Sequence, residues 1–366
     1  MRSYDTIVIG AGMAGLCVAR ELAKLGEKVL VLEQDSKGGN SSRAAAGIID
    51  PYTEASEETP LFRLALAAFK CYEGFLRGLG PRAKDRVEFK KTGALYLSFS
   101  EEDEKFLKSR FVWQRRREIP AEWLSAEAVL KKEPAVSPRV RSGIFYPEIP
   151  KLNADQLTGL CLKAAVRQRI SLRREVEDIR VECRGKKVQG VSIRGEKFES
   201  RSVVVAAGSL SGAGPYLGVR VKVEPVRGQI LILRPPPSRS PQTILHSLRY
   251  AYIIPWPRNR VLVGSTLESA GFNDRVTREG KEDILRRAGE IMEGIDSFSV
   301  ERSWAGLRPF PERGRAFVGP TRIAGLFLAT GYYRSGILIA PLVGKLLAEG
   351  IHSGIFSPLL LPFFLE

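Results

Sequence analysis

Histidine and cysteine are scarce in this sequence. Only two histidines, His246 and His352, and four cysteines occur among 366 residues. The cysteines form no C-x-x-C pair, so neither a disulfide framework nor a zinc site is expected. Cys17 and Cys161 lie in apolar helical contexts and are expected to be packed thiols. The sequence therefore predicts no metal site, and it offers little material for a histidine general base.

Acidic residues are outnumbered by basic ones. The sequence has 57 Lys and Arg against 41 Asp and Glu, which gives a formal net charge of +16 at pH 7. Such an excess is compatible with a nucleic-acid or anionic-membrane partner. The basic residues are scattered, however, and the densest cluster is Arg110 with 115–117. An ordinary solvated surface is therefore the favoured interpretation, with both partners kept as alternatives.

Long hydrophobic runs are also missing. No uninterrupted apolar stretch reaches the roughly 18 residues that a transmembrane helix needs. The apolar N-terminus is interrupted by Gly10, Gly12 and Gly15 and does not resemble a signal peptide. The apolar tail at 358–365 is too short to span a membrane and is expected to dock on the protein body. We expect a cytoplasmic protein.

The N-terminal segment carries a dinucleotide-binding pattern. Residues 6–9 form a β-branched run typical of a buried parallel strand, and Gly10, Gly12 and Gly15 follow at G-x-G-x-x-G spacing. The first glycine suits a tight turn, the second a close approach of pyrophosphate, and the third close packing of helix on strand. Residues 16–25 are predicted to form that helix, whose N-terminus would face the phosphates.

A second strand is predicted at 28–32, and it ends in Glu33. This carboxylate follows the glycines by about 20 residues, the spacing at which an acid binds the ribose hydroxyls of an adenosine. It would repel a 2′-phosphate, so NADP is disfavoured. The motif by itself does not separate FAD from NAD.

The rest of the chain is predicted to form an α/β protein, with a discontinuous Rossmann-like domain and an inserted antiparallel layer. A helix at 154–168 and a buried strand that ends near Gly208 continue the dinucleotide domain, whereas strands at 93–99, 229–233, 250–255 and 260–265 and a helix at 281–295 belong to the insertion. We assign 1–85, 152–212 and 300–366 to the cofactor domain and 86–151 and 213–299 to the substrate domain.

Several segments together resemble one family. They are 38–48, 225–229, 252–255, 263–266, 304–309 and 330–341, in the family's order along nearly the whole chain. The sequence resembles flavin-dependent amine oxidases of the D-amino-acid oxidase superfamily, and within it the glycine oxidase branch, which serves thiamine biosynthesis in many bacteria. The segments around Trp304 and Arg334 are the specific ones. The resemblance implies FAD as the dinucleotide and a Rossmann-like FAD-binding domain with an antiparallel substrate domain.

The resemblance also implies which residues contact FAD. The predicted cofactor-binding set is Gly10, Gly12, Met13, Ala14, Gly15, Glu33, Gln34, Ser41, Ser42, Arg43, Ala46, Gly47, Ile48, Val176, Gly208, Tyr332, Tyr333, Ser335, Gly336, Ile337 and Leu338. Ser41, Ser42 and Arg43 can contact pyrophosphate oxygens, and 44–47 has no bulk, so backbone can lie against a flat ring. The alternative for 44–47 is an alanine-rich helix.

The resemblance implies three residues that bind the substrate. Arg334 would hold a carboxylate with its guanidinium fork, Tyr252 would assist it, and Arg308 would lie nearby. A structural ion pair is the alternative for Arg308, and cross-strand packing is the alternative for Tyr252. Tyr250 stands where some family members have histidine, so the mouth of the pocket is expected to differ.

The implied activity is oxidation of glycine, sarcosine or a small D-amino acid to a 2-oxo acid, ammonia or an amine, and hydrogen peroxide. Orientation and desolvation carry such a reaction without a protein base. The region between Trp304 and Phe317 has no cysteine for a covalent flavin link, so FAD is expected to be non-covalent. The family favours a homo-oligomer. A membrane-associated dehydrogenase with a quinone acceptor and a tRNA-modifying flavin oxidase remain alternatives.

Overall fold

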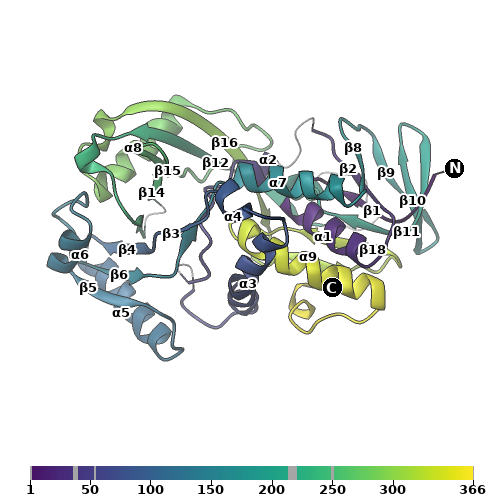
Figure 1. The fold of residues 1–366 in the computed structure, drawn as a ribbon, viewed down its shortest axis with the longest axis horizontal. Helices are drawn as coiled ribbons and strands as arrows, with labels where there is room; N and C mark the ends of the chain where they lie inside the picture. The colour runs from purple at the N-terminus through teal and green to yellow at the C-terminus, as the bar shows by residue number, and fades with distance from the viewer. Residues whose placement is uncertain (1, 36–39, 53–54, 213–220, 249–250, 366) are drawn as a thin grey trace.

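The structure is a computed structural model that describes residues 2–35, 40–52, 55–212, 221–248 and 251–365. Its strands form two eight-stranded sheets, one in each lobe of an elongated molecule, and one two-stranded sheet (Figure 1). Residues 38–39, which belong to the first resembling segment, and Tyr250 lie outside the described residues.

The first sheet occupies the right lobe of Figure 1 and has the order β17-β18-β11-β1-β2-β8. The β9–β10 hairpin extends it beside β11. The strands β18, β11, β1, β2 and β8 run parallel, with β8 at the edge of the sheet. The bounds are β1 (Arg2–Ile9), β2 (Val29–Leu32), β8 (Ser171–Arg173), β9 (Ile179–Arg184), β10 (Lys187–Ile193), β11 (Glu196–Val205), β17 (Phe317–Pro320) and β18 (Leu326–Thr330).

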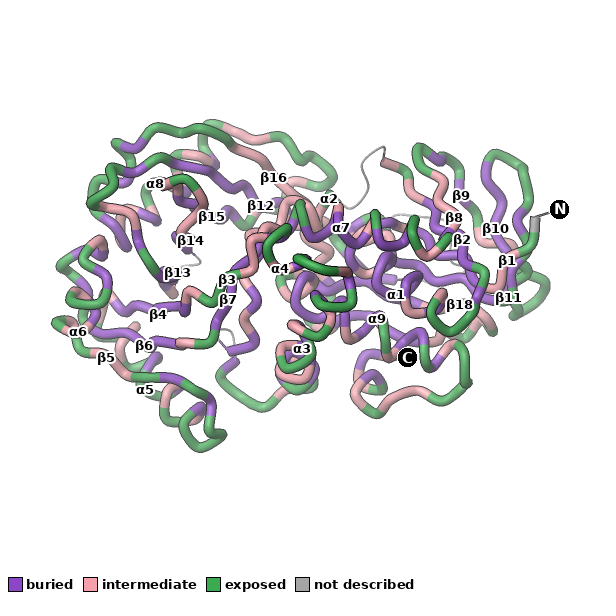
Figure 2. Tube along the Cα trace, in the orientation of Figure 1, coloured by how far each residue is buried: buried purple, intermediate pink, exposed green. Residues whose placement is uncertain are grey.

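Side-chain alternation along β1 divides this sheet into two buried faces. Val8 joins the core formed with the helices, whereas Ile7 and Ile9 join the core on the opposite face, against the β9–β10 hairpin. The helical face is covered by α1 (Met13–Lys24), α3 (Pro60–Arg77), α7 (Ala154–Arg167) and α9 (Gly336–Ser353). Burial on both faces explains the continuous apolar strands, which appear as purple tube in Figure 2.

The predicted N-terminal unit is confirmed. The strand at 6–9 is the end of β1, the strand at 28–32 is β2, and the helix is α1. The helix begins three residues earlier than expected, because its first turn starts directly after Gly12. Gly26 takes a left-handed φ of +86° just past its end, as expected of a helix stop.

The second sheet occupies the left lobe and has the order β16-β12-β15-β14-β13-β4-β6-β5. All its neighbours are antiparallel except β13 and β4. The bounds are β4 (Ala94–Ser98), β5 (Glu122–Ser125), β6 (Ser142–Tyr146), β12 (Val223–Arg234), β13 (Ile244–Ser247), β14 (Tyr252–Trp256), β15 (Arg260–Gly264) and β16 (Ser299–Pro311).

Short elements connect and cover the two sheets. Helices α5, α6 and α8 lie in the left lobe, and the β3–β7 ribbon lies between the lobes (Figure 1). Their bounds are α2 (Asn40–Arg43), α4 (Ala83–Arg86), α5 (Glu101–Arg115), α6 (Ala126–Lys132), α8 (Arg278–Ile291), β3 (Lys90–Lys91) and β7 (Pro150–Lys151).

The structure differs from the sequence expectations at several places in the second lobe. Residues 300–311 were assigned to the cofactor domain, yet they form β16, which pairs along the length of β12. β5, β6 and β13 were not predicted. The alternating segment at 93–99 forms β4, all five residues of which are buried, because one face packs on the core beneath α8 and the other on Tyr52 and Phe62.

Helix α9 is long and apolar enough to cross a membrane by length and composition, with a mean hydropathy of 1.2 over 18 residues. Half of that window is buried inside the protein, where α9 packs against α1 and α3. The Tyr72 hydroxyl of α3 donates a hydrogen bond to the Ile337 carbonyl at the start of α9. These contacts are those of a core helix. The C-terminal tail docks as expected, with Leu360 and Phe363 buried in the same core.

The crossing of α1 and α9 yields a stability prediction. A Cβ added at Gly344 would lie 2.6 Å from the Cys17 Cβ, whereas a Cβ at Gly289 in α8 would meet nothing within 4 Å. We expect Gly344→Ala to lower the free energy of unfolding by about 1–3 kcal/mol through overpacking. Gly289→Ala should raise it by up to about 1 kcal/mol through helix propensity.

Urea titration of both variants beside the wild type measures this difference. Equal effects of the two substitutions would contradict a close approach of α1 and α9.

Candidate cofactor and substrate site

The turn between β1 and α1 leaves no room for a side chain at two of its glycines. Gly10 has φ +109°, and a Cβ there would collide with the Ala206 carbonyl at the end of β11. A Cβ at Gly15 would collide with the Gly10 carbonyl, so α1 sits directly on the turn. Gly12 is the N-cap residue of α1 and lacks a side chain to occupy the helix N-terminus. That end therefore offers N–H groups and the positive end of the helix dipole.

Carboxylate and hydroxyl groups fix the loops around this turn. Glu33 Oε2 accepts a hydrogen bond from the Ala11 N–H at 2.7 Å, and its Oε1 accepts one from the Asp35 N–H at 3.0 Å. Ser42 Oγ accepts a hydrogen bond from the Met13 N–H at 3.0 Å. Glu33 thus stands at the end of β2 with further acceptor capacity on each oxygen.

A cleft of about 500 Å³ opens at the carboxyl ends of the parallel strands. Among the described residues that line it, Arg334 is the only basic one, so the N-terminus of α1 is the principal attraction for a phosphate group. The predicted cofactor residues in its lining are Gly10, Gly12, Met13, Ala14, Glu33, Gln34, Ser41, Ser42, Gly208, Tyr332, Tyr333, Gly336 and Ile337.

Three predicted cofactor residues have other contacts. Gly15 packs beneath the turn. Arg43 forms an ion pair with Asp155 at the start of α7. The Val176 N–H donates a hydrogen bond to the Glu33 carbonyl at 3.1 Å, and its buried side chain joins the core of the first sheet. None of the three lines the cleft in the described part of the chain.

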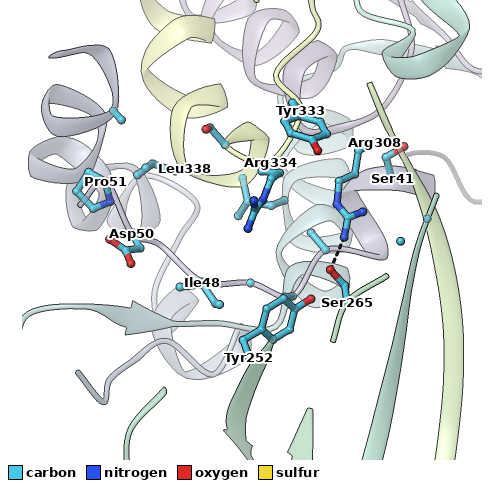
Figure 3. A pocket seen from close by; sticks show the side chains of 18 of the residues that line it. Ser41, Ile48, Asp50, Pro51, Tyr252, Ser265, Arg308, Tyr333, Arg334 and Leu338 are labelled. Atoms are coloured by element: carbon cyan, nitrogen blue, oxygen red, sulfur yellow. Dashed lines mark hydrogen bonds between the residues drawn. The ribbon is translucent and has the colours of Figure 1, made fainter. Parts of the chain in front are cut away.

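A second cavity, of about 230 Å³, adjoins the cleft and is bounded by both lobes (Figure 3). Four of the predicted residues line both spaces, namely Ser41, Tyr333, Arg334 and Ile337. The remaining predicted residues in the second cavity are Ala46, Gly47, Ile48, Tyr252, Arg308, Ser335 and Leu338. The alanines of 44–46 follow the end of α2 rather than continuing it, so the alternative of an alanine-rich helix is excluded.

The two predicted basic residues of the cavity come from different elements. Arg334 lies in the loop between β18 and α9, in the centre of Figure 3, and faces the space between Tyr252 and Tyr333. Arg308 comes from β16 and donates hydrogen bonds to Ser265 Oγ at 2.7 Å and to the Thr266 carbonyl at 3.2 Å. Its guanidinium also fills the space where Gly228 lacks a side chain. Arg308 is therefore held in the cavity wall, while Arg334 projects from a loop.

His246 lines this cavity, although the sequence analysis gave it no role in the site. It stacks on Tyr96 and contacts Tyr252 edge-on, with ring centroids 5.3 and 6.0 Å apart. Burial, followed by the charges of Arg334 and Arg110, lowers the pKa of His246 to about 3. Burial raises the pKa of the Tyr252 phenol, and the Arg308 charge opposes that rise. Both side chains are neutral near pH 7.

Further lining residues also lacked a sequence signal. Asp50, Thr59 and Phe62 line the cavity, and Phe272 and Asp274 line the cleft. His246 lies on β13, whose parallel pairing with β4 joins strands far apart in the chain. Only the tertiary arrangement brings these residues to the site.

The polar groups that line the cleft fit a flavin dinucleotide. The Glu33 carboxylate suits ribose hydroxyls, the α1 N-terminus suits a pyrophosphate, and the short side chains of 44–46 leave a smooth wall where the cleft meets the cavity. The N-terminus of α9 at Gly336 also faces the cleft.

Comparisons with known proteins agree with this geometry. The chain is 31% identical over 352 residues to a glycine oxidase of Geobacillus kaustophilus (strain HTA426), covering 94% of this chain and 92% of that protein. It is 28% identical to a glycine oxidase of Bacillus subtilis (strain 168), covering 95% and 93%. The crystal structure of glycine oxidase from Geobacillus kaustophilus superposes with a TM-score of 0.92 at 28% identity, covering 100% of this chain and 99% of that one.

A family profile described as "DAO: FAD dependent oxidoreductase" matches residues 5–350. This match confirms the predicted fold class and the identification of the dinucleotide as FAD. The chain belongs to the DAO family of FAD-dependent oxidoreductases.

Proposed function

We propose that this protein oxidises glycine or another small amino acid or secondary amine. The substrate carbon next to nitrogen loses two electrons, water releases a 2-oxo acid and ammonia or an amine, and oxygen is reduced to hydrogen peroxide. The observation that carries the proposal is the place of Arg334, a cation where the small cavity meets the cofactor cleft. The glycine oxidases among its relatives support the same substrate class.

We propose that Arg334 binds the substrate carboxylate and that Tyr252 donates a hydrogen bond to it. A guanidinium fork fixes orientation as well as supplying charge. The neutral phenol of Tyr252 retains the proton that such a bond requires. The cavity of about 230 Å³ suits a small substrate. Arg308, fixed by Ser265 and Thr266, adds positive potential to the wall.

The residues of the cleft are proposed to hold FAD without a covalent link. Bound flavin supplies the two-electron oxidant and passes the electrons to oxygen. The N-terminus of α9, at Gly336, points a helix dipole at the cleft and would favour negative charge there. We propose the first sheet with its helices as the cofactor domain, and the second sheet as the substrate domain. A homo-oligomer is the proposed assembly.

The cavity residues leave no histidine base for the reaction. His246 is neutral and its pKa lies near 3, so it is a poor proton acceptor at neutral pH. The substrate amine must therefore lose its proton before oxidation, and positive charge from Arg334 and Arg308 favours that loss. The neutral imidazole of His246 adds a polar group to the cavity wall and helps to exclude water.

Arg334→Ala is expected to lower kcat/KM for glycine about 100-fold to 1000-fold, chiefly through KM, because two charge-assisted hydrogen bonds are lost. Arg334→Lys keeps the charge without the guanidinium fork, so its kcat/KM should fall by less than that of Arg334→Ala. The flavin absorbance of both variants should match that of the wild type.

Arg286→Ala, on the exposed side of α8, is the matched control for removing an arginine. Peroxide release measures the rates. Unchanged kinetics in Arg334→Ala would remove Arg334 from substrate binding.

The pH profile follows from the state of His246. We expect kcat/KM to rise about tenfold per pH unit below the pKa of the free substrate amine, since only the neutral amine reacts. His246 is already neutral across this range, so His246→Gln should lower the rate without moving the inflection. An inflection near pH 6.5 that disappears in His246→Gln would identify the imidazole as the base.

Acid precipitation tests the attachment of FAD. We expect the yellow chromophore to remain in the supernatant, because no cysteine lies between Trp304 and Phe317 to anchor it. The absorbance of pellet and supernatant measures the partition. A pellet that stays yellow would contradict a non-covalent cofactor.

A further inference from the structure

The segment 266–277 joins β15 to α8 and reaches from the second sheet to the cofactor cleft. Phe272 and Asp274 line the cleft, although the two elements that flank their segment, β15 and α8, belong to the second lobe. The other lining residues come chiefly from the first sheet, its helices and β16. Neither residue has a role in the proposed reaction.

Arg227 ties the segment to β12. Its side chain is 8% exposed, and Nη2 donates to Glu268 Oε2 at 2.5 Å in an ion pair. Nη1 donates to the carbonyl of Arg275 at 3.1 Å and to that of Asn273 at 3.4 Å. The backbones of Arg227 and Glu268 also exchange hydrogen bonds at 2.9 and 3.0 Å. One buried guanidinium therefore holds both sides of the loop tip.

Gln229 provides a second attachment two residues along the same strand. This residue is fully buried, and its Nε2 donates to Glu268 Oε1 at 2.9 Å and to Thr277 Oγ1 at 3.2 Å. Its Oε1 accepts a hydrogen bond from the Thr277 N–H at 2.8 Å. The two ends of the segment are thus fixed to β12, and this explains the polar residues of the 225–229 motif, which no part of the reaction uses.

The tip between these attachments carries a large apolar side chain at the mouth of the cleft. Phe272 is 49% exposed, and it belongs to none of the four apolar cores of the described chain. A scattered exposed aromatic is ordinary on a protein surface, but this one is held beside a cavity by buried polar contacts. A bound dinucleotide would remove part of its ring from water.

We propose that 266–277 is a strap that retains FAD. Phe272 packs against the bound cofactor from the solvent side, Asp274 offers acceptors to its hydroxyl groups, and Arg227 and Gln229 hold the strap in place. The strap acts on cofactor release rather than on oxidation of the substrate.

Flavin release from the holoenzyme tests the strap. After dilution, free FAD is followed by the rise of its fluorescence, with no substrate present. Phe272→Ala should raise the release rate and the Kd about fivefold to tenfold, the effect of losing roughly half of a phenylalanine's burial. Leu267→Ala is the matched control, because Leu267 is 51% exposed in the same segment but does not line the cleft. It should release FAD at the wild-type rate.

Glu268→Gln tests the attachment separately. This substitution removes the ion pair with Arg227 and keeps the side-chain shape. It should raise the release rate, and adding it to Phe272→Ala should give less than the product of the two effects, since both act through one contact.

Wild-type release rates in Phe272→Ala would overturn the proposal. So would an equal effect of Leu267→Ala, or a fall of kcat in Phe272→Ala at saturating FAD with an unchanged Kd. An unchanged rate in Glu268→Gln would overturn the anchoring by Arg227. Because the measurement needs no amine, these outcomes do not depend on the proposed substrate.

Discussion

The hydrogen bond between the Ala11 N–H and the Glu33 carboxylate joins the two loops on which the cofactor cleft depends. It forms because β1 and β2 are parallel neighbours in register, with Ile9 opposite Leu32, so both strands end at the same edge of the sheet. Gly10 turns the chain there at a φ that other residues rarely adopt, and α1 begins with its N–H groups facing the cleft. The same edge receives the loop that carries Arg334.

The second sheet completes the site from the other side. Tyr252 on β14, Arg308 on β16 and His246 on β13 are brought to one cavity by the antiparallel strands that lie between them. Ser265 and Thr266, at the end of β15, hold Arg308 in place. The cavity thus takes Arg334 from the first sheet and Tyr252, Arg308 and His246 from the second, and their relative position depends on the interface between the lobes rather than on any one loop.

Local sequence patterns predicted those parts of the site whose residues lie close together in the chain. The β1–α1–β2 unit was identifiable because its glycines, its strands and Glu33 lie within one short segment. Arg334 and Tyr252 came from resemblance, and the structure brings both to the cavity. Arg43 and Val176 lie near predicted elements but contact Asp155 and the backbone of Glu33, because the sequence pattern does not fix where such side chains point.

The sequence by itself determined the class of cofactor fold, the scarcity of histidine, and the presence of a basic residue after the last strand of the first sheet. Only the tertiary structure decided that β16 pairs with β12, that His246 is buried against Tyr96 and Tyr252, and that Phe272 reaches the cleft. The reason is physical. The turn and the strand pair of the β1–α1–β2 unit are encoded by residues that lie close together in the chain. Strand order, and the reach of a loop from one lobe to the other, depend on contacts between residues far apart in the chain. Hydrophobic periodicity carries no information about such contacts.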